Sequence, residues 1–560
     1  MGISRDGLTQ CIQQKRLGGN RAALFVYVCP LVDAVMEGLD NMAFISIAVS
    51  LVLYFYGYMN FSLTKSATML TNFMGTAFLM ALFGGFISDT YLSRFKTCVL
   101  FGSIEVVGYF LLTVQAYFHV LRPFPCKNVA PSSRNECETA GSGQIAFLCT
   151  ALYLIALGNG GVKAALPSLG ADQFDDKNPK EAAKLSSFFN WFLFSLTIGA
   201  IFGVTFVVWI STNQGWEWGI GVCTLSVFFA IVFVYMGKST YRHNIPTGSP
   251  IIRVLQVLVA AIRNRKLSIP DIADELHEEQ DKEAGIATEI LQRTDQFRFL
   301  DRAAITTNAH SMSPLNTPSA WHLCTVTQVE EAKILIRMVP IILSTVFMNT
   351  CLAQLQTFSI QQSTTMDTRV FGFQVPGPSL PVIPLVFMAI LIPLYDRIFV
   401  PIARKLTGIP TGIRHLQRIG IGLVLSAISM AIAGVMETRR KSVAVKYNMV
   451  DSIDPLPMNV FWLGFQYAIF GAADMFTLVG LLEFFYAESS AGMKSLGTAI
   501  SWSSLAFGYF LSTMMVEVVN KVSGGWLASN NLNRDKYKKV DELKSTGDIG
   551  EVKVEMSKIK

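Results

Sequence analysis

Charged residues are scarce in this chain. Only 15% of its 560 residues are Asp, Glu, Lys or Arg, whereas 51% are hydrophobic, and the mean hydropathy is +0.42. This composition excludes a cytosolic enzyme and a disordered scaffold, because both expose far more charge. The net charge of +6 does not indicate nucleic-acid binding, since cytoplasmic loops of membrane proteins carry excess Lys and Arg anyway. We therefore expect a membrane protein without a nucleic-acid partner.

Histidine and cysteine are also few, and neither forms a recognisable site. The six His are dispersed and the nine Cys are scattered, so no zinc spacing or disulfide framework emerges. One pair, Cys126 and Cys137, falls in a loop that we expect to face outward, where a disulfide can form. We expect no enzymatic activity, no cofactor and no metal.

Long apolar runs are the dominant feature of the sequence. Runs of about 18 or more such residues predict membrane-spanning helices. Six lie before a polar central stretch and five after it: 22–55, 67–88, 97–118, 144–167, 187–210, 217–236, 334–359, 379–401, 415–436, 459–486 and 494–520. No later run is long enough, so a twelfth span is not expected. Two hydrophobic halves around a charged loop are typical of a secondary transporter.

Lys and Arg in the short loops predict the orientation. Most fall on one side if the N-terminus is cytoplasmic, although Arg439, Arg440 and Lys441 fall on the other. We therefore expect a cytoplasmic arm, an N-terminal membrane half, a cytoplasmic central loop with an amphipathic helix or two, a C-terminal membrane half and a charged tail outside. Their bounds are 1–21, 22–236, 237–333, 334–520 and 521–560.

Carboxylates at bilayer depth mark the first candidate site, because ionisable groups there are costly and by default functional. Asp33, Glu37 and Asp40 share one helical face, with Asn41 beside them. Such a cluster cannot be fully ionised away from water, and a proton-coupled carrier needs this property. A purely structural salt-bridge face is the alternative.

Other polar residues extend this candidate site to further spans. Lys163 follows a glycine-rich stretch without a counter-ion on its own helix, so Glu37 is its candidate partner; the alternative is that Lys163 reaches to an interface. Asp474 lies well inside an apolar span and is a pore candidate, whereas a structural role is favoured for Glu105. The seventh span carries Gln354 and Gln356, which either line a wet cavity or bond neighbouring helices.

Several motifs resemble those of a known family. The stretch 84–95, Gly-Gly-Phe-Ile-Ser-Asp-Thr-Tyr-Leu-Ser-Arg-Phe, looks like the signature loop of the major facilitator superfamily, in which Asp89 and Arg94 would form a cytoplasmic gate. Together with 170–175, 187–192, 416–420 and 482–486, it resembles the plant nitrate transporter 1 and peptide transporter family, a proton-coupled oligopeptide transporter branch. The resemblance runs from about 18 to 535. It implies an all-α integral membrane fold of two six-helix-type halves, here with the twelfth helix apparently missing.

The sequence departs from this family at the proposed coupling residues. The family's Glu-x-x-Glu-Arg motif, whose residues take part in proton coupling with a fourth-span lysine, corresponds to Glu37-Gly38-Leu39-Asp40-Asn41. Lys163 matches the lysine, and Asp474 matches a tenth-span glutamate with one methylene fewer. The resemblance thus implies proton coupling through Glu37, Asp40 and Lys163.

The residues that we expect to line the substrate cavity are Asn41, Leu352, Gln354, Gln356 and Asp474. Their chemistry indicates the class of substrate. Leu352 stands where nitrate-binding members have a histidine, and leucine cannot donate a hydrogen bond to an anion. Residues 71–79 and the Asn41 variant look most like the subgroup associated with abscisic acid and gibberellin transport. We therefore expect symport of protons and a small organic anion across the plasma membrane. A nitrate or di/tripeptide carrier, or a membrane sensor that does not transport, are the alternatives.

Overall fold

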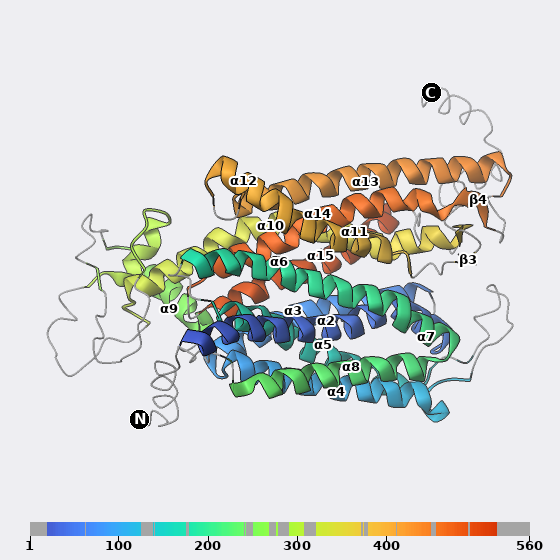
Figure 1. Ribbon diagram of the computed structural model, residues 1–560, viewed down its shortest axis with the longest axis horizontal. Coiled ribbons are helices and arrows are strands. Elements are labelled where there is room, and N and C mark those ends of the chain that lie inside the picture. The colour runs from blue at the N-terminus through green and yellow to red at the C-terminus, as the bar shows by residue number, and fades with distance from the viewer. Residues whose placement is uncertain are drawn as a thin grey trace.

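The computed structural model is nearly all helical (Figure 1). It describes residues 19–61, 63–124, 138, 140–174, 179–239, 241, 250–267, 276–277, 291–306, 321–370, 373–374, 379–409, 412–449, 455–490 and 493–522. The predicted disulfide between Cys126 and Cys137, residues 1–18 of the predicted arm 1–21, and the charged tail from 523 lie outside these residues. Residues 19–21 of the predicted arm are helical.

The first half of the chain forms a group of long helices. They are α2 (Gly19–Gly57), α3 (Leu63–Thr90), α4 (Arg94–Tyr117), α5 (Ser142–Ala171), α6 (Pro179–Phe202), α7 (Val208–Asn213) and α8 (Trp216–Met236). A π-helical turn at Gly203–Val207 joins α6 to α7 without a break. Local sequence sets the start of α4, where the Ser93 side chain accepts a hydrogen bond from the Lys96 backbone N–H.

The second half repeats this arrangement with fewer helices among the described residues. They are α10 (Val326–Thr364), α11 (Val382–Leu394), α12 (Val400–Thr407), α13 (His415–Lys446), α14 (Gly464–Glu488) and α15 (Lys494–Val522). Another π-helical turn, Tyr395–Phe399, links α11 to α12. Short strands lie at one end: β1 (Met366–Asp367) pairs in parallel with β4 (Leu456–Asn459), and β2 (Arg369–Val370) pairs antiparallel with β3 (Phe373–Gln374).

The described residues contain 11 helices long and apolar enough to cross a membrane. These coincide with the eleven predicted spans, so the predicted membrane fold class is confirmed. The seventh span begins earlier than predicted, at Val326 instead of 334. Its polar first turns are helical because Thr325 and Gln328 form a capping box. The ninth continues to Lys446, beyond the predicted 436, because Glu437 and Arg440 pair on the helix at 2.7 Å.

Part of the central loop packs against the start of α10. The amphipathic helix α9 (Pro250–Arg263) and a 3₁₀ turn at Arg298–Ala304 share a small apolar core with α10 that includes Val257, Leu300 and Val329. Lys333 on α10 pairs with Asp301 at 2.6 Å and with Glu330 at 2.7 Å. An amphipathic helix in this loop was predicted, but its attachment to α10 was not.

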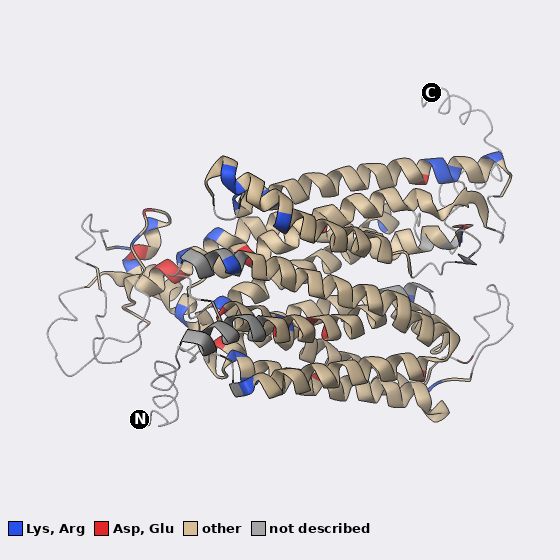
Figure 2. Ribbon diagram, viewed as in Figure 1, with Lys and Arg blue, Asp and Glu red and all other residues tan. Residues whose placement is uncertain are grey.

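The end of the bundle at which α9 lies is called the inner end, because the sequence predicts it to be cytoplasmic; the opposite end is the outer end. Lys and Arg gather at the inner end, and a smaller group lies at the outer end of α13 (Figure 2). The apolar middle of the helices carries few charges. The charges that do lie there are therefore the first place to look for a site.

Glycines in α5 allow three helices to pack closely in the first half. A Cβ atom on Gly158 would lie 2.6 Å from the backbone nitrogen of Glu105 on α4, and one on Gly160 would lie 2.7 Å from backbone of Met80 on α3. Real Cβ atoms do not approach so closely, so each position requires glycine. These close approaches bring α5, which carries Asn159 and Lys163, against α4 and α3.

Candidate functional site

A cavity of about 290 Å³ lies between the two halves. Residues of α2, α3, α5 and α6 line one side of it, and residues of α10, α11, α14 and α15 line the other. Most are apolar or aromatic. The residues with polar side-chain atoms are Asn41, Thr71, Lys163, Gln356, Thr357, Tyr467, Asp474, Trp502 and Tyr509. An apolar pocket with a few converging polar groups is the usual form of a small-molecule site.

Four of the five predicted cavity residues line this cavity: Asn41, Leu352, Gln356 and Asp474. The Asn41 amide also donates to the Leu196 backbone carbonyl at 2.9 Å, which fixes its orientation. Gln356 accepts a hydrogen bond from the Tyr509 hydroxyl. The fifth, Gln354, lies off the cavity wall.

Gln354 instead joins two helices, since its amide donates to the Ser512 hydroxyl of α15 at 2.8 Å. Its position follows from helical geometry. Gln354 and Gln356 are two residues apart and therefore point to different faces of α10. The sequence showed a run of glutamines but not which of them faced the cavity.

Lys163 places a cation on the cavity wall. Its Nζ lies 3.6 Å from Oε1 of Glu37 and is nearly fully buried, with 2% of the side chain exposed. Two rings flank the ammonium, with centroids 5.0 Å away for Trp502 and 5.4 Å for Phe44. The predicted pairing of Lys163 with Glu37 is thus found in the structure, and the aromatic contacts were not foreseen. The rings stabilise the ammonium, and its positive charge in an apolar, weakly screening pocket can attract an anionic ligand.

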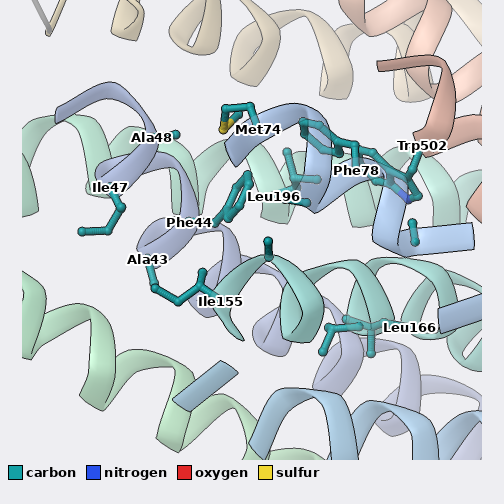
Figure 3. Packing of buried hydrophobic residues seen from close by; sticks show 14 of the residues in the cluster. Ala43, Phe44, Ile47, Ala48, Met74, Phe78, Ile155, Leu166, Leu196 and Trp502 are labelled. Atoms are coloured by element: carbon teal, nitrogen blue, oxygen red, sulfur yellow. The ribbon is translucent and has the colours of Figure 1, made fainter. Parts of the chain in front are cut away.

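The wall around Lys163 is built from stacked aromatic side chains. Phe78 and Trp502 lie almost parallel, with ring centroids 5.9 Å apart, and Phe78 stacks on Tyr509 at 6.0 Å. Figure 3 shows Phe44, Phe78 and Trp502 in the packed interior near Leu196. Because Phe78 belongs to α3 and Trp502 to α15, these rings join the two halves beside the cavity.

The three predicted carboxylates of α2 have different partners. Asp33 accepts a hydrogen bond from the Tyr241 hydroxyl at 2.6 Å, toward the inner end. Glu37 faces Lys163, and Asp40 accepts from the Asn159 amide at 3.0 Å. All three are buried. The assignment of Glu37, Asp40 and Lys163 to proton coupling stays a prediction.

Asp89 and Arg94, the predicted gate residues, lie 3.5 Å apart. Both also contact the second half of the chain. Arg94 donates to the Ser495 hydroxyl at 2.8 Å, and Asp89 accepts from the Leu496 backbone N–H at 2.8 Å. Arg94 pairs with Asp172 as well, and Asp172 accepts from the Tyr486 hydroxyl at 3.1 Å. The helices α3, α4 and α5 are thus tied to α14 and α15 at the inner end.

A second set of contacts closes the inner end beside the first. Asp396 accepts from Ser187 at 3.0 Å and from Asn190 at 2.8 Å. Asn190 in turn accepts from Arg418 at 3.0 Å, and Arg418 lies 3.5 Å from Glu483. Asn190, Arg418 and Glu483 lie in stretches that were noted only as family motifs, as does Ser187, whereas Asp396 lies in none of them. None of these residues was predicted to belong to the gate. The cavity, by contrast, is lined as far as Leu53 and Ile360 near the outer ends of α2 and α10.

The sequence matches known proteins over most of its length. A family model described as the POT family matches residues 95–532. Among curated proteins of Arabidopsis thaliana, Protein NRT1/PTR FAMILY 4.5 is 44% identical over 526 residues, which is 93% of this chain and 89% of that protein. Protein NRT1/PTR FAMILY 4.6 is 42% identical over 539 residues, or 93% and 90%.

Solved structures share the fold. An auto-inhibited POT family peptide transporter superimposes with a TM-score of 0.57 at 16% identity, covering 93% of this chain and 91% of that one. A proton dependent oligopeptide (POT) family transporter gives a TM-score of 0.51 at 18% identity, covering 87% and 91%. At these identities the likeness concerns the fold alone.

Proposed function

Because this chain belongs to the POT family of proton-coupled membrane transporters, within its NRT1/PTR branch, we propose that it carries a small organic anion such as abscisic acid or gibberellin. The family is one of transporters, not of enzymes. In this proposal protons enter with the substrate, and the protein works in the plasma membrane. Glu37, Asp40 and Lys163 couple the two fluxes, while Asp89 and Arg94 gate the inner end.

The observation that carries this proposal is Lys163, a buried ammonium on the wall of a largely apolar cavity. A carboxylate that approaches Lys163 competes with Glu37 for the ammonium. Glu37 gains a proton when it loses that partner, because an unpaired buried carboxylate is strongly disfavoured. Anion binding and proton binding therefore favour each other. The aromatic and aliphatic walls suit the apolar ring system of a hormone acid.

Leu352 argues against nitrate at the same place. It lines the cavity and has no hydrogen-bond donor for a small inorganic anion. Asp474 supports a second candidate, because a cavity with Lys163 and Asp474 on its wall offers opposite charges to the two ends of a zwitterionic di- or tripeptide. The first candidate is preferred because most of the wall is apolar.

Uptake of labelled abscisic acid, gibberellin, nitrate and a dipeptide by cells expressing the chain tests the proposal at two external pH values. We expect accumulation of an organic acid that increases in the more acidic medium. Lys163→Gln should abolish it, whereas Lys405→Gln, which removes an exposed lysine on α12, should not. Accumulation of the dipeptide alone would favour the second candidate. Accumulation of none, with the protein shown at the cell surface, would favour a sensor.

A further inference from the structure

Three polar side chains from three different helices meet behind the cavity. The amide nitrogen of Asn159 on α5 lies 3.0 Å from Oδ2 of Asp40 on α2 and 3.3 Å from Oε1 of Glu105 on α4. All three residues are buried, with at most 1% exposed. The amide has two N–H groups, so one Asn159 bridges two carboxyl groups.

The two carboxyl groups face each other across this amide, because both accept from the same nitrogen of Asn159. Oδ1 of Asp40 and Oε2 of Glu105 are buried and have no hydrogen-bond partner among the described residues. A hydrogen bond between two carboxyl groups requires a proton on one of them, because ionised carboxylates only accept.

The described residues around Asp40 and Glu105 do not supply the positive charge that would be needed to stabilise both side chains as ionised carboxylates. Among the described residues, Lys163 is the cation whose charge acts on both carboxyl groups, and its Nζ already lies 3.6 Å from Oε1 of Glu37. The other titratable groups that act on the pair are Glu37 of α2 and Cys98 and Tyr109 of α4, all of which are buried. None of these is cationic. Two adjacent negative charges in this setting would be strongly disfavoured.

We propose that Asp40 and Glu105 form a proton-binding site that holds a single shared proton, oriented by Asn159. This proton-binding site adds a named proton position to the proposed coupling. Its role in transport rests on the proposed function, whereas proton binding at the site does not. Asn159 and Lys163 are four residues apart on α5 and so share one helix face. When Lys163 turns from Glu37 to a substrate anion, the electrostatic effect of its ammonium on Asp40 and Glu105 changes. The shared proton is bound or released in response.

Infrared spectroscopy of the purified chain in liposomes tests proton binding without any substrate. Protonated carboxyl groups have a C=O stretching band that carboxylates lack. In Glu105→Gln the new amide donates to Asp40 as the protonated acid did, so Asp40 stays ionised and the band of one carboxyl group is lost. Asp40→Asn should lose the same amount by the same argument. Glu488→Gln, which alters an exposed carboxylate at the end of α14, should lose nothing at neutral pH.

The double variant decides whether one proton is shared. Glu105→Gln combined with Asp40→Asn should lose no more band area than either single variant. Loss of two carboxyl groups in the double variant would show two independent protons, and no loss in the double variant would show that the site holds no proton. Both results would overturn the proposal.

The transport role has its own readout. Glu105→Gln fixes the site in a state that resembles the protonated one, so uptake of abscisic acid should lose its dependence on external pH while exchange of labelled for unlabelled substrate continues. An unchanged pH profile at reduced rate would indicate a structural residue and contradict the coupling role. If abscisic acid is not transported at all, the hormone proposal fails, and the infrared result still decides the proton site.

Discussion

Glu37 on α2 and Lys163 on α5 form a buried ion pair, with 3.6 Å between Oε1 and Nζ. The pair lies beside the cavity, and only Lys163 reaches its wall. Neither oxygen of Glu37 has a hydrogen-bond partner among the described residues. The carboxylate therefore depends on Lys163 for its stabilisation, and Lys163 is the member that a ligand can reach.

Removing one member of this pair should be more harmful than removing both. A buried charge without its partner typically costs about 3–5 kcal/mol, so Glu37→Gln and Lys163→Gln should each lower the thermal stability of the purified protein markedly. The double variant should recover much of the loss, because it leaves no uncompensated charge. The measurement is the unfolding temperature in detergent of the unchanged protein, the two single variants and the double variant, which together form a double-mutant cycle. Losses that simply add in the double variant would show that the residues do not interact.

Weakening the contacts that join the two halves at the inner end should open that end of the bundle. Asp172→Asn removes the charge that pairs with Arg94 and weakens the link to Tyr486. Spin labels at Lys184 on α6 and Lys405 on α12, in a chain without its native cysteines, report the distance between the halves. We expect this distance to lengthen.

Asp367→Asn is the matched control for this experiment, because it makes the same chemical change in β1 at the outer end. It should leave the label distance unchanged. An unaltered distance in Asp172→Asn would show that the remaining contacts, such as Asp396 with Asn190, hold the inner end closed by themselves.

The close packing of α4 on α5 can be tested at Gly158. A Cβ atom there would lie 2.6 Å from the backbone nitrogen of Glu105, so Gly158→Ala should force the helices apart and cost about 1–3 kcal/mol. Gly143→Ala on the same helix has nothing within 4 Å of the new methyl group and should be neutral or slightly stabilising. Thermal unfolding separates the two. Equal stability of Gly158→Ala and Gly143→Ala would show that α4 can move away from α5 without lowering the stability of the protein.

The sequence allowed the spans to be predicted because apolar length alone determines whether a helix can cross a bilayer. It also indicated the partner of Lys163, since a buried cation without a local counter-ion needs a carboxylate from elsewhere. It could not show that Glu105 meets Asp40, because that contact depends on how α4 turns against α5 at Gly158. The sequence could not show that Gln354 lies off the wall of this cavity for a similar reason: composition does not reveal how a helix is rotated about its axis.

The inner-end contacts were equally hidden. Asp172 and Tyr486 occur in motifs that the sequence showed, but nothing local indicates that the two side chains bond to each other across the halves. The packing of α9 and the 3₁₀ turn on α10 was missed because the central loop is polar overall. Its apolar core comes from a few side chains that are scattered along the sequence, such as Val257 and Leu300.

Asp474 distinguishes the two candidate substrates. It lines the same cavity as Lys163 and has no ion pair among the described residues. An ionised Asp474 repels a substrate that carries only a carboxylate, but it attracts the amino group of a peptide. At an effective dielectric constant of about 20, one such charge changes binding by about 1 kcal/mol or more at the distances found across a small cavity, which is at least about fivefold in affinity.

Asp474→Asn should therefore lower the KM for abscisic acid and raise the KM for a dipeptide. Asn has nearly the size of Asp but carries an NH2 donor in place of one acceptor oxygen, so the change removes the charge with little change of shape. Concentration-dependent uptake at fixed external pH measures both constants, and Asp367→Asn again serves as the control. A higher KM for abscisic acid in Asp474→Asn would mean that the carboxylate helps to bind the acid, and the cavity would then have to be understood as a site for ligands with a positive group.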